Sequence, residues 1–265
     1  MSLPELSDTV KELFSYEVAL PSLKTFHEDL ALQKKVASDL YGVSVDEIAS
    51  IKSFGIAMLK EIYTTITGFN ILLENGRSET FFAKEPKSHP LFEAVGITLQ
   101  NLLLGEEQKF LYSDSLDDST PERMIVIDQL RGSRLGFPET LKTEISYSFG
   151  IALELARTLA LDDRHAGNIL VSEKGAVRHL DNDCLFYHKD LFQGDYHIKW
   201  FHLDEDAVSE GTIDGYKLIR NNFLKYQPEI ESMVNYFSKK MCSEEDDYIL
   251  DDPFTHMKLY LGVSR

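Results

Sequence analysis

Two short polar stretches decide how this sequence is interpreted: residues 162–171, DDRHAGNILV, and residues 179–183, HLDND. In each, aspartate or asparagine side chains stand beside a short β-branched or aliphatic run, which is typical of loops held rigid by a neighbouring strand. Asn168 follows Asp163 by five positions, and Asp181 follows Asn168 by thirteen. Carboxylates and a carboxamide in tight loops are suited to binding Mg²⁺ and orienting a hydroxyl group.

This set of side chains predicts phosphoryl transfer. Such a reaction needs an aspartate that orients or deprotonates the acceptor hydroxyl, and an asparagine and a second aspartate that hold Mg²⁺ on the triphosphate. We therefore expect Asp163 to be catalytic and Asn168 and Asp181 to bind the metal and, through it, the nucleotide. Asp183 is a further candidate metal ligand. The alternative is a structural role in which these side chains only accept hydrogen bonds from loop amides.

The two stretches resemble the catalytic and metal-binding loops of the phosphatidylinositol 3/4-kinase-related branch of the protein-kinase-like superfamily. In that branch the pattern D-R-H-x-x-N-I precedes H-[IL]-D-F-G. The resemblance implies a bilobal α+β fold, with a small β-rich N-lobe and a larger, mostly helical C-lobe. It also implies ATP as the nucleotide and Mg²⁺, with Mn²⁺ as the alternative, as the metal. His165 would assist the acceptor proton or stabilise the transferring phosphate, and a structural histidine is the alternative.

The resemblance implies roles for residues that precede these loops. Lys84, at the end of a predicted strand, would contact the α- and β-phosphates, so it is both a catalytic and a nucleotide-binding candidate. Glu93, on the helix that follows, would pair with Lys84 and hold it in place. Asp128 and Leu130 belong to a connector whose backbone would bind the adenine. Residues between two predicted strands would cover the phosphates with hydroxyls and amides: Thr64, Thr65, Thr67 and Gly68.

The N-terminal half is predicted to contain a helical segment and the β-rich lobe. Residues 1–53 are expected to be helical and packed on the core, with a capping box at Ser44 and Glu47. The N-lobe and connector are expected over residues 54–130. The elements predicted there are strands over 62–66, 69–73 and 80–83, a hairpin turn at 74–77, a helix over 90–104 and a strand over 124–127.

Residues 131–265 are predicted to form the C-lobe. The clearest helix spans about 145–160, because apolar residues recur there at spacings of three and four. Short strands are expected over 169–171 and 177–180, and the remainder from 212 is predicted to be mainly helical. The segments with turn composition are 131–133 and 136–138.

Composition limits the classes of partner. The chain has 27 Lys+Arg against 44 Asp+Glu, a net charge of −17, and 43% hydrophobic residues. This acidity argues against a nucleic-acid partner and against docking on an anionic membrane, so an anionic ligand needs a local cation. Every apolar run is interrupted by charged residues, so no transmembrane segment is expected. The two cysteines, Cys184 and Cys242, lack metal-binding spacing, which favours a reducing, cytoplasmic compartment.

The sequence departs from the family pattern at three points. Asn182 and Asp183 replace the phenylalanine and glycine that follow the metal-binding aspartate. No G-x-G-x-x-G motif precedes Lys84, and the absence of an A-P-E motif argues against an ordinary eukaryotic protein kinase. The Asn182-Asp183 departure keeps two alternatives open, a nucleotide-binding pseudokinase and an enzyme that transfers AMP.

The acceptor is predicted to be a protein Ser/Thr hydroxyl. Lipid kinases of the branch place a basic segment after the metal loop, whereas residues 187–206 contain Lys189 and Lys199 against a larger number of acidic side chains: Asp190, Asp195, Asp204, Glu205 and Asp206. A phosphoinositide acceptor is the alternative. The third class of interpretation is a helical interaction protein in which the DRHAGN loop is fortuitous. The small size is compatible with a secreted effector that acts in a host or target cell.

Overall fold

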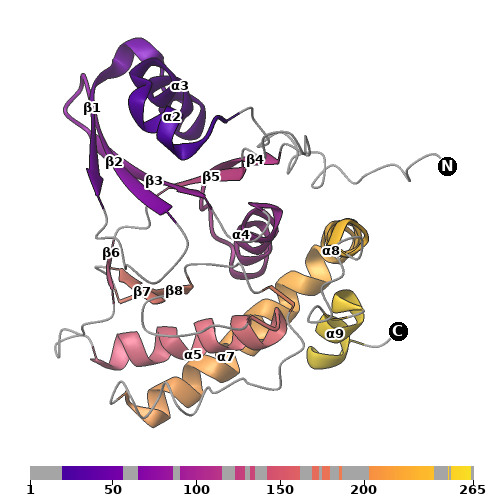
Figure 1. The fold of residues 1–265 in the computed structure, drawn as a ribbon. Helices are drawn as coiled ribbons and strands as arrows, with labels where there is room; N and C mark the ends of the chain where they lie inside the picture. The colour runs from indigo at the N-terminus through magenta and orange to yellow at the C-terminus, as the bar shows by residue number, and fades with distance from the viewer. Residues whose placement is uncertain are drawn as a thin grey trace. The chain divides into compact units, whose positions relative to one another are not determined.

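The structure is a computed structural model of the 265-residue chain. It describes residues 20–55, 65–85, 90–114, 123–128, 132–134, 142–161, 169–172, 175–179, 185–186, 203–241, 250 and 252–263. The chain divides into two compact units (Figure 1). The sheet unit contains Lys11–Ala94 and Glu107–Gln129, and the helical unit contains Val95–Glu106 and Leu130–Arg265.

The sheet unit is built on five antiparallel strands. Their spatial order is β1 (Ile48–Gly55), β2 (Thr65–Leu73), β3 (Ser78–Glu85), β5 (Arg123–Asp128) and β4 (Phe110–Asp114). This N-terminal sheet precedes a mostly helical C-terminal part. The predicted α+β class is therefore confirmed.

Helices α2 (Leu23–Glu28) and α3 (Leu30–Tyr41) cover one face of the sheet (Figure 1). Phe26 of α2 is fully buried, and its ring meets Phe69 and Phe81 at centroid distances of 5.3 and 6.2 Å. Burying one such ring contributes about 1.5–3 kcal/mol. Side chains alternate along a strand, so residues next to Phe69 and Phe81 in sequence face the other side. The helices and the sheet thus share one core, which contains Leu20, Leu23, Phe26, Val36, Ala37, Leu40, Ile48, Ile71, Leu73, Ala83 and Val126.

Strand β1 corrects the predicted boundary between residues 53 and 54. It begins at Ile48, directly after a 3₁₀ helix whose start, at Ser44 and Glu47, has the predicted capping box. A bulge between Ile48 and Ser50 shifts the register, and Ile48 and Ile51 both pack on the same core. A spacing of three between apolar residues is typical of a helix. The alternation of apolar and polar residues that predicts a strand is therefore missing here.

The hairpin between β2 and β3 has its turn where predicted. The Leu73 amide donates to the Arg77 carbonyl, and Gly76 has a φ of 83° that favours glycine. The predicted break near residue 67 is wrong, because β2 runs without interruption from Thr65. Strand β4 was not predicted, because Phe110, Leu111 and Tyr112 are all buried and so show no alternation of apolar and polar residues.

The helical unit is organised around α5 (Lys142–Thr158) and α7 (Glu205–Lys225), which pack closely together. Helices α8 (Gln227–Met241) and α9 (Pro253–Tyr260) follow. A small sheet has the order β6 (Gly132–Arg134), β7 (Ile169–Ser172) and β8 (Val177–His179). Strand β6 replaces the turn predicted over 131–133, because its backbone pairs with β7. Helix α4 (Pro90–Leu104) has the predicted bounds, beginning in the sheet unit and ending in the helical unit.

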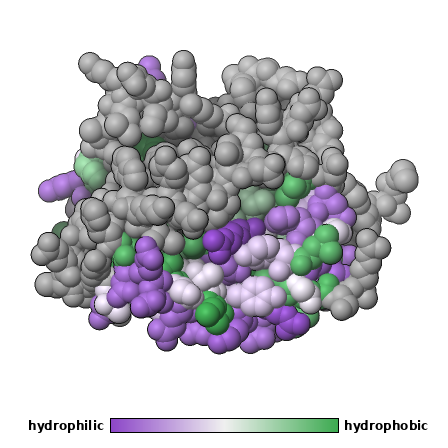
Figure 2. Space-filling view, turned by 90° about the horizontal axis from the view of Figure 1, so that it is seen from below, coloured by the Kyte–Doolittle hydropathy of each residue, from purple (hydrophilic) through white to green (hydrophobic). Residues whose placement is uncertain are grey.

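The coloured surface in Figure 2 is mainly hydrophilic or neutral, with hydrophobic side chains in separate groups. The large exposed apolar residues of α7 and α9 are spread along those helices: Ile213, Leu218, Leu224 and Leu259. Isolated residues of this kind are common on protein surfaces. No helix in the described part of the chain is long and apolar enough to span a membrane.

The contact between α5 and α7 depends on glycines. A Cβ atom added at Gly211 would overlap the backbone carbonyl of Tyr147, and one added at Gly150 would overlap the carbonyl of Val208. Neither obstacle is a flexible side chain, so one helix would have to move. The glycines therefore set the separation between the two helices.

We predict that Gly211→Ala destabilises the protein by about 1–3 kcal/mol, because the added methyl group overpacks the helix contact. Equilibrium unfolding in urea measures this change. Ser209→Ala, at an exposed position of the same helix, is the control and is expected to change stability by less than about 0.5 kcal/mol. Gly→Ala normally favours a helix, so an increase in stability would contradict the close packing.

Candidate functional site

A buried ion pair lies between the sheet and the first turn of α4. Lys84, near the end of β3, has its Nζ 3.5 Å from Oε2 of Glu93. The two residues are only 5% and 2% exposed. The sequence predicted a contact between these residues, and the structure contains it. A role toward nucleotide phosphates stays a prediction.

Strand alternation explains where Lys84 lies. Its neighbour Ala83 belongs to the core with α2 and α3, so Lys84 projects from the opposite face. Its neighbours across the sheet are Ile66 of β2 and Ile125 of β5. A lysine among such residues is unfavourable unless an acidic partner compensates its charge, and Glu93 provides that charge. The strand therefore places the Lys84 cation beside two apolar neighbours, Ile66 and Ile125.

The same face carries a row of aromatic residues around a glycine. Phe54, Gly68 and Phe82 are neighbours across β1, β2 and β3. The Phe54 ring covers Gly68 so closely that a Cβ atom there would overlap it, and it meets the Phe82 ring edge-on at 6.0 Å. Phe82 and Lys84 point the same way, because they are two residues apart in one strand. The half-buried rings and Lys84 thus share a surface.

The predicted role of Thr65, Thr67 and Gly68 as a phosphate-covering loop needs correction. Thr65 is the first residue of β2 and is paired with Glu85, while Thr67 is paired with Ala83. Threonine is β-branched and fits a strand, which explains the difference. Thr64 lies outside the described residues.

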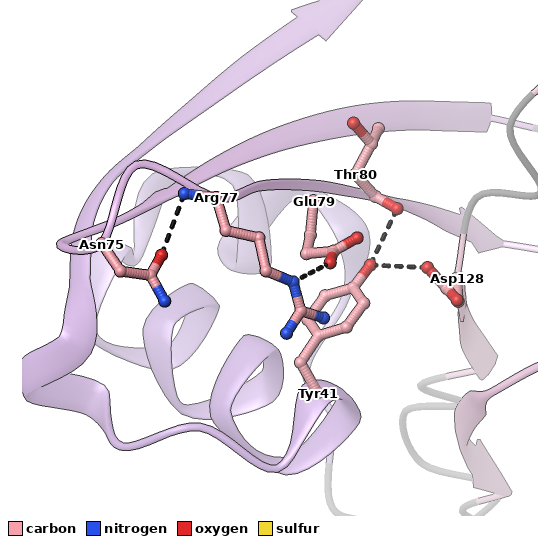
Figure 3. A network of polar contacts seen from close by, with 6 residues as sticks. All are labelled: Tyr41, Asn75, Arg77, Glu79, Thr80 and Asp128. Atoms are coloured by element: carbon pink, nitrogen blue, oxygen red, sulfur yellow. Dashed lines mark hydrogen bonds and ion pairs between the residues drawn. The ribbon is translucent and has the colours of Figure 1, made fainter.

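Asp128 belongs to a polar network rather than to a free connector (Figure 3). The hydroxyl of Tyr41, on α3, lies 2.8 Å from Oδ1 of Asp128 and 2.8 Å from the carbonyl oxygen of Thr80. Tyr41 therefore links its helix to the two neighbouring strands β3 and β5. Burial, followed by the Asp128 charge, raises the pKa of Tyr41 well above its ordinary value, so the phenol stays protonated.

Strand β5 ends at Asp128, one residue later than predicted, so Asp128 is a strand residue at the start of the predicted connector, and a role toward adenine stays a prediction. Its amide donates to the Lys109 carbonyl at 2.9 Å, and its carbonyl accepts a contact from Gln108 Nε2 at 3.5 Å. Both backbone polar groups of Asp128 thus have partners in the segment 108–109. Leu130, the other connector candidate, lies outside the described residues.

The predicted catalytic and metal-binding side chains lie outside the described residues. Asp163, His165 and Asn168 belong to the segment 162–168, and Asp181 and Asp183 to the segment 180–184. Their roles stay predictions. The structure does describe the residues that flank both segments.

The ends of the two segments are held together in pairs. Ile169, which follows the first segment, is paired in the β7–β8 ladder with His179, which precedes the second. At the other side, the Phe186 amide donates to the Leu159 carbonyl at 3.1 Å. Leu161, which precedes the first segment, is buried and donates its amide back into the end of α5. Residues that flank the two segments thus contact one another within the helical unit.

The end of α5 is also held by α9. Tyr260 of α9 donates its hydroxyl to Oε1 of Glu154 at 2.8 Å, and Arg157 lies 3.5 Å from the other carboxylate oxygen. Glu154 is 2% exposed. Burial raises the pKa of Glu154 above its ordinary value, while Tyr260 and Arg157 act in the opposite direction. These contacts stabilise the helix end from which the segment 162–168 departs.

The described residues contain no group of three or more His, Cys, Asp or Glu side chains that could hold a metal. All three predicted metal ligands, Asn168, Asp181 and Asp183, belong to the segments outside the description. Comparison of the sequence with models of known protein families gives no match, and comparison with curated proteins gives no significant match. The functional argument therefore depends on the residues themselves.

Sequence reasoning missed Tyr41 and Phe186. Nothing in the spacing around Tyr41 distinguishes it from other apolar-face positions of α3, since its partners Thr80 and Asp128 are far away in sequence. The aromatic pair Phe186-Tyr187 indicates no more than packing when it is considered as sequence alone. The backbone conformation of Phe186 becomes apparent only in the structure.

We predict that Lys84→Met and Glu93→Met each destabilise the protein by about 3–5 kcal/mol, because each removes one charge of a buried ion pair and leaves the other without this compensation. The double variant is expected to recover most of that loss, since two apolar side chains replace the pair. Urea unfolding of the three variants measures the coupling. A double variant that loses the sum of both single effects would show that the two residues act independently.

We predict that Tyr41→Phe lowers stability by about 1–3 kcal/mol, because half-buried acceptors on β3 and β5 lose a hydrogen-bond donor. The control is Tyr226→Phe, since the Tyr226 hydroxyl has no hydrogen-bond partner among the described residues. Thermal and urea unfolding of both variants provide the measurement. Equal stability of Tyr41→Phe and wild type would show that the hydrogen bonds of Tyr41 to β3 and β5 do not stabilise the protein.

Proposed function

We propose that this protein is an ATP-dependent phosphotransferase that transfers the γ-phosphate to Ser/Thr hydroxyls of a protein. Lys84 contacts the α- and β-phosphates, Asn168 and Asp181 hold Mg²⁺, and Asp163 orients the acceptor hydroxyl. His165 assists the transfer. Two lobes of protein-kinase-like fold provide these residues.

The observation that carries this proposal is the buried pair of Lys84 and Glu93. In protein kinases a lysine on the third strand of the small lobe pairs with a glutamate on the helix that follows, and both must be in place for activity. Here Lys84 is on the third strand of an antiparallel sheet, and Glu93 is on the helix that directly follows it. Replacing such a pair by apolar residues is often neutral for stability, so stability alone is a weak reason for keeping it. A role in binding an anionic ligand would be sufficient reason for keeping the Lys84–Glu93 pair.

The helical unit supplies the second support. Residues that flank the two predicted site segments, 162–168 and 180–184, contact each other. Ile169 pairs with His179 in the β7–β8 ladder, and the Phe186 amide donates to the Leu159 carbonyl. Asn168 is covalently next to Ile169, and Asp181 is two residues beyond His179, the ladder partner of Ile169. Chain connectivity therefore attaches two predicted metal ligands to one end of one strand pair. Metal binding on a triphosphate requires such proximity.

Charge favours a protein acceptor over an anionic lipid. Asp204 caps α7, and Glu205 and Asp206 are exposed in its first turn, within the stretch where a lipid kinase of the resembled branch carries basic residues. These carboxylates would repel a phosphoinositide headgroup. They would attract basic side chains beside a Ser or Thr acceptor.

Nucleotide binding is tested by the melting temperature with ATP, with and without Mg²⁺. We expect wild type to gain about 5–10 °C at a ligand concentration near 100 times Kd. Lys84→Met is expected to lose this gain relative to its own unliganded melting temperature. Lys52→Met, at an exposed position of β1, is the control and should retain it. Absence of stabilisation by any ATP–metal combination would contradict both the kinase and the pseudokinase interpretation.

Transfer is tested with ATP labelled on the γ- or the α-phosphate, using a cell lysate and phosphoinositide vesicles as parallel acceptors. We predict γ-label on protein, and we predict that Asp163→Ala and Asp181→Ala abolish it without changing the fold. Asp39→Ala, an exposed aspartate on α3, is the matched control and should remain active. Label from the α-phosphate would indicate AMP transfer, which the Asn182-Asp183 departure favours, and label on lipid would indicate a phosphoinositide kinase.

A further inference from the structure

Two aromatic side chains meet on the face of the sheet that carries Lys84. Phe54 of β1 and Phe82 of β3 are both half-buried, and their rings lie edge-on with centroids 6.0 Å apart. The strand between them has Gly68 at the paired position. A Cβ atom there would lie 2.2–2.7 Å from the far end of the Phe54 ring, so the ring occupies the space that a side chain would fill. The glycine therefore allows the two rings to meet across β2.

The side chains of this face change in character along the strands. Toward the hairpin lies a polar row, which contains Lys52, Asn70 and Thr80. The next row is apolar and half-buried, and it contains Phe54, Phe82 and Ile127. Lys84 belongs to the row after that. Successive rows are about 7 Å apart, because an antiparallel strand advances about 3.4 Å per residue. An aromatic surface thus lies one row away from a buried cation.

This arrangement suits a ligand that has a flat aromatic part and an anionic part. Nucleotide bases stack on aromatic side chains, and in the proposed function Lys84 contacts phosphates. The core that the sheet shares with α2 and α3 is on the opposite face and contains Phe69 and Phe81, but neither Phe54 nor Phe82. The two half-buried rings are therefore additional to the aromatic residues that hold the helices on the sheet.

We propose that Phe54 and Phe82 form the contact surface for the aromatic base of the nucleotide, whose phosphates extend toward Lys84. The inference rests on the proposed function, because it assigns the base to a surface beside the proposed phosphate contact. Gly68 permits the arrangement, since a larger residue would displace the Phe54 ring. The alternative is a purely structural role, in which the rings only cover a glycine that would otherwise weaken the strand.

Isothermal titration calorimetry with ATP and with tripolyphosphate, both in the presence of Mg²⁺, separates the two roles. Tripolyphosphate has the phosphates of ATP without the base. We expect Phe54→Leu and Phe82→Leu each to weaken ATP binding by about tenfold, because an aliphatic side chain loses the stacking contact with the base. The affinity of both variants for tripolyphosphate should stay within about twofold of wild type.

Phe81→Leu is the matched control. Phe81 is next to Phe82 in β3 but is fully buried on the opposite face, where its ring stacks on Phe69 with centroids 4.9 Å apart. The control is expected to lower the melting temperature and to leave both affinities within about twofold of wild type, because its ring belongs to the core.

Gly68→Ala protects the test against a folding failure of the ring variants. It retains both rings, and its methyl group meets only the movable end of the Phe54 side chain. We expect this variant to fold, to displace the Phe54 ring and to weaken ATP binding severalfold without weakening tripolyphosphate binding.

Two results would overturn the base contact while leaving the proposed function in place. One is an unchanged ATP affinity in Phe54→Leu, Phe82→Leu and Gly68→Ala, and the other is an equal loss of affinity for ATP and for tripolyphosphate. A wild-type protein that binds neither ligand would overturn the proposed function, and this inference with it.

Discussion

The buried pair of Lys84 and Glu93 is the interaction on which the rest of the sheet unit depends. A charged lysine in an apolar setting requires an acidic partner at a fixed place, since an unpaired buried ion costs several kcal/mol. That requirement constrains β3, which must direct Lys84 away from the core that contains Ala83, and α4, which must begin so that Glu93 falls in its first turn. Helices α2 and α3 occupy the opposite face. One face of the sheet thus packs against α2 and α3, and the other carries the Lys84 ammonium group beside Glu93.

The helical unit meets a related requirement by fixing chain ends. The close packing of α5 on α7 through Gly150 and Gly211 gives α5 a rigid support. The end of α5, the β7–β8 ladder and Phe186 then hold the boundaries of two short polar segments. Function-bearing loops on a rigid scaffold are a common arrangement in enzymes.

Local sequence signals predicted much of this fold. The turn at residues 74–77, the helix over 90–104 and the capping box at Ser44 follow from residue type and spacing, and the structure has all three. Features set by distant contacts were not predictable. The bulge in β1 interrupts the alternation of apolar and polar residues by which a strand is predicted. Residues on both faces of β4 are buried, so that strand shows no such alternation. Strand β6 forms by pairing with β7, which its own sequence does not indicate.

The candidate site likewise has features that could be predicted from the sequence and features that depend on distant contacts. The pairing of Lys84 with Glu93 was predicted from the resemblance of the sequence to the kinase branch, and the structure contains this contact. The backbone groups of Asp128 and the β2 position of Thr65 depend on strand pairing that no local pattern encodes.

The central claim is that Lys84 contacts nucleotide phosphates. An acyl-phosphate derivative of ATP, which transfers its acyl group to a lysine amine beside the bound phosphates, tests this most directly when the labelled site is identified by peptide mass spectrometry. The account predicts that Lys84 is the lysine labelled selectively and that excess ATP with Mg²⁺ prevents the labelling. Labelling spread over exposed lysines, with no protection by ATP, would contradict it.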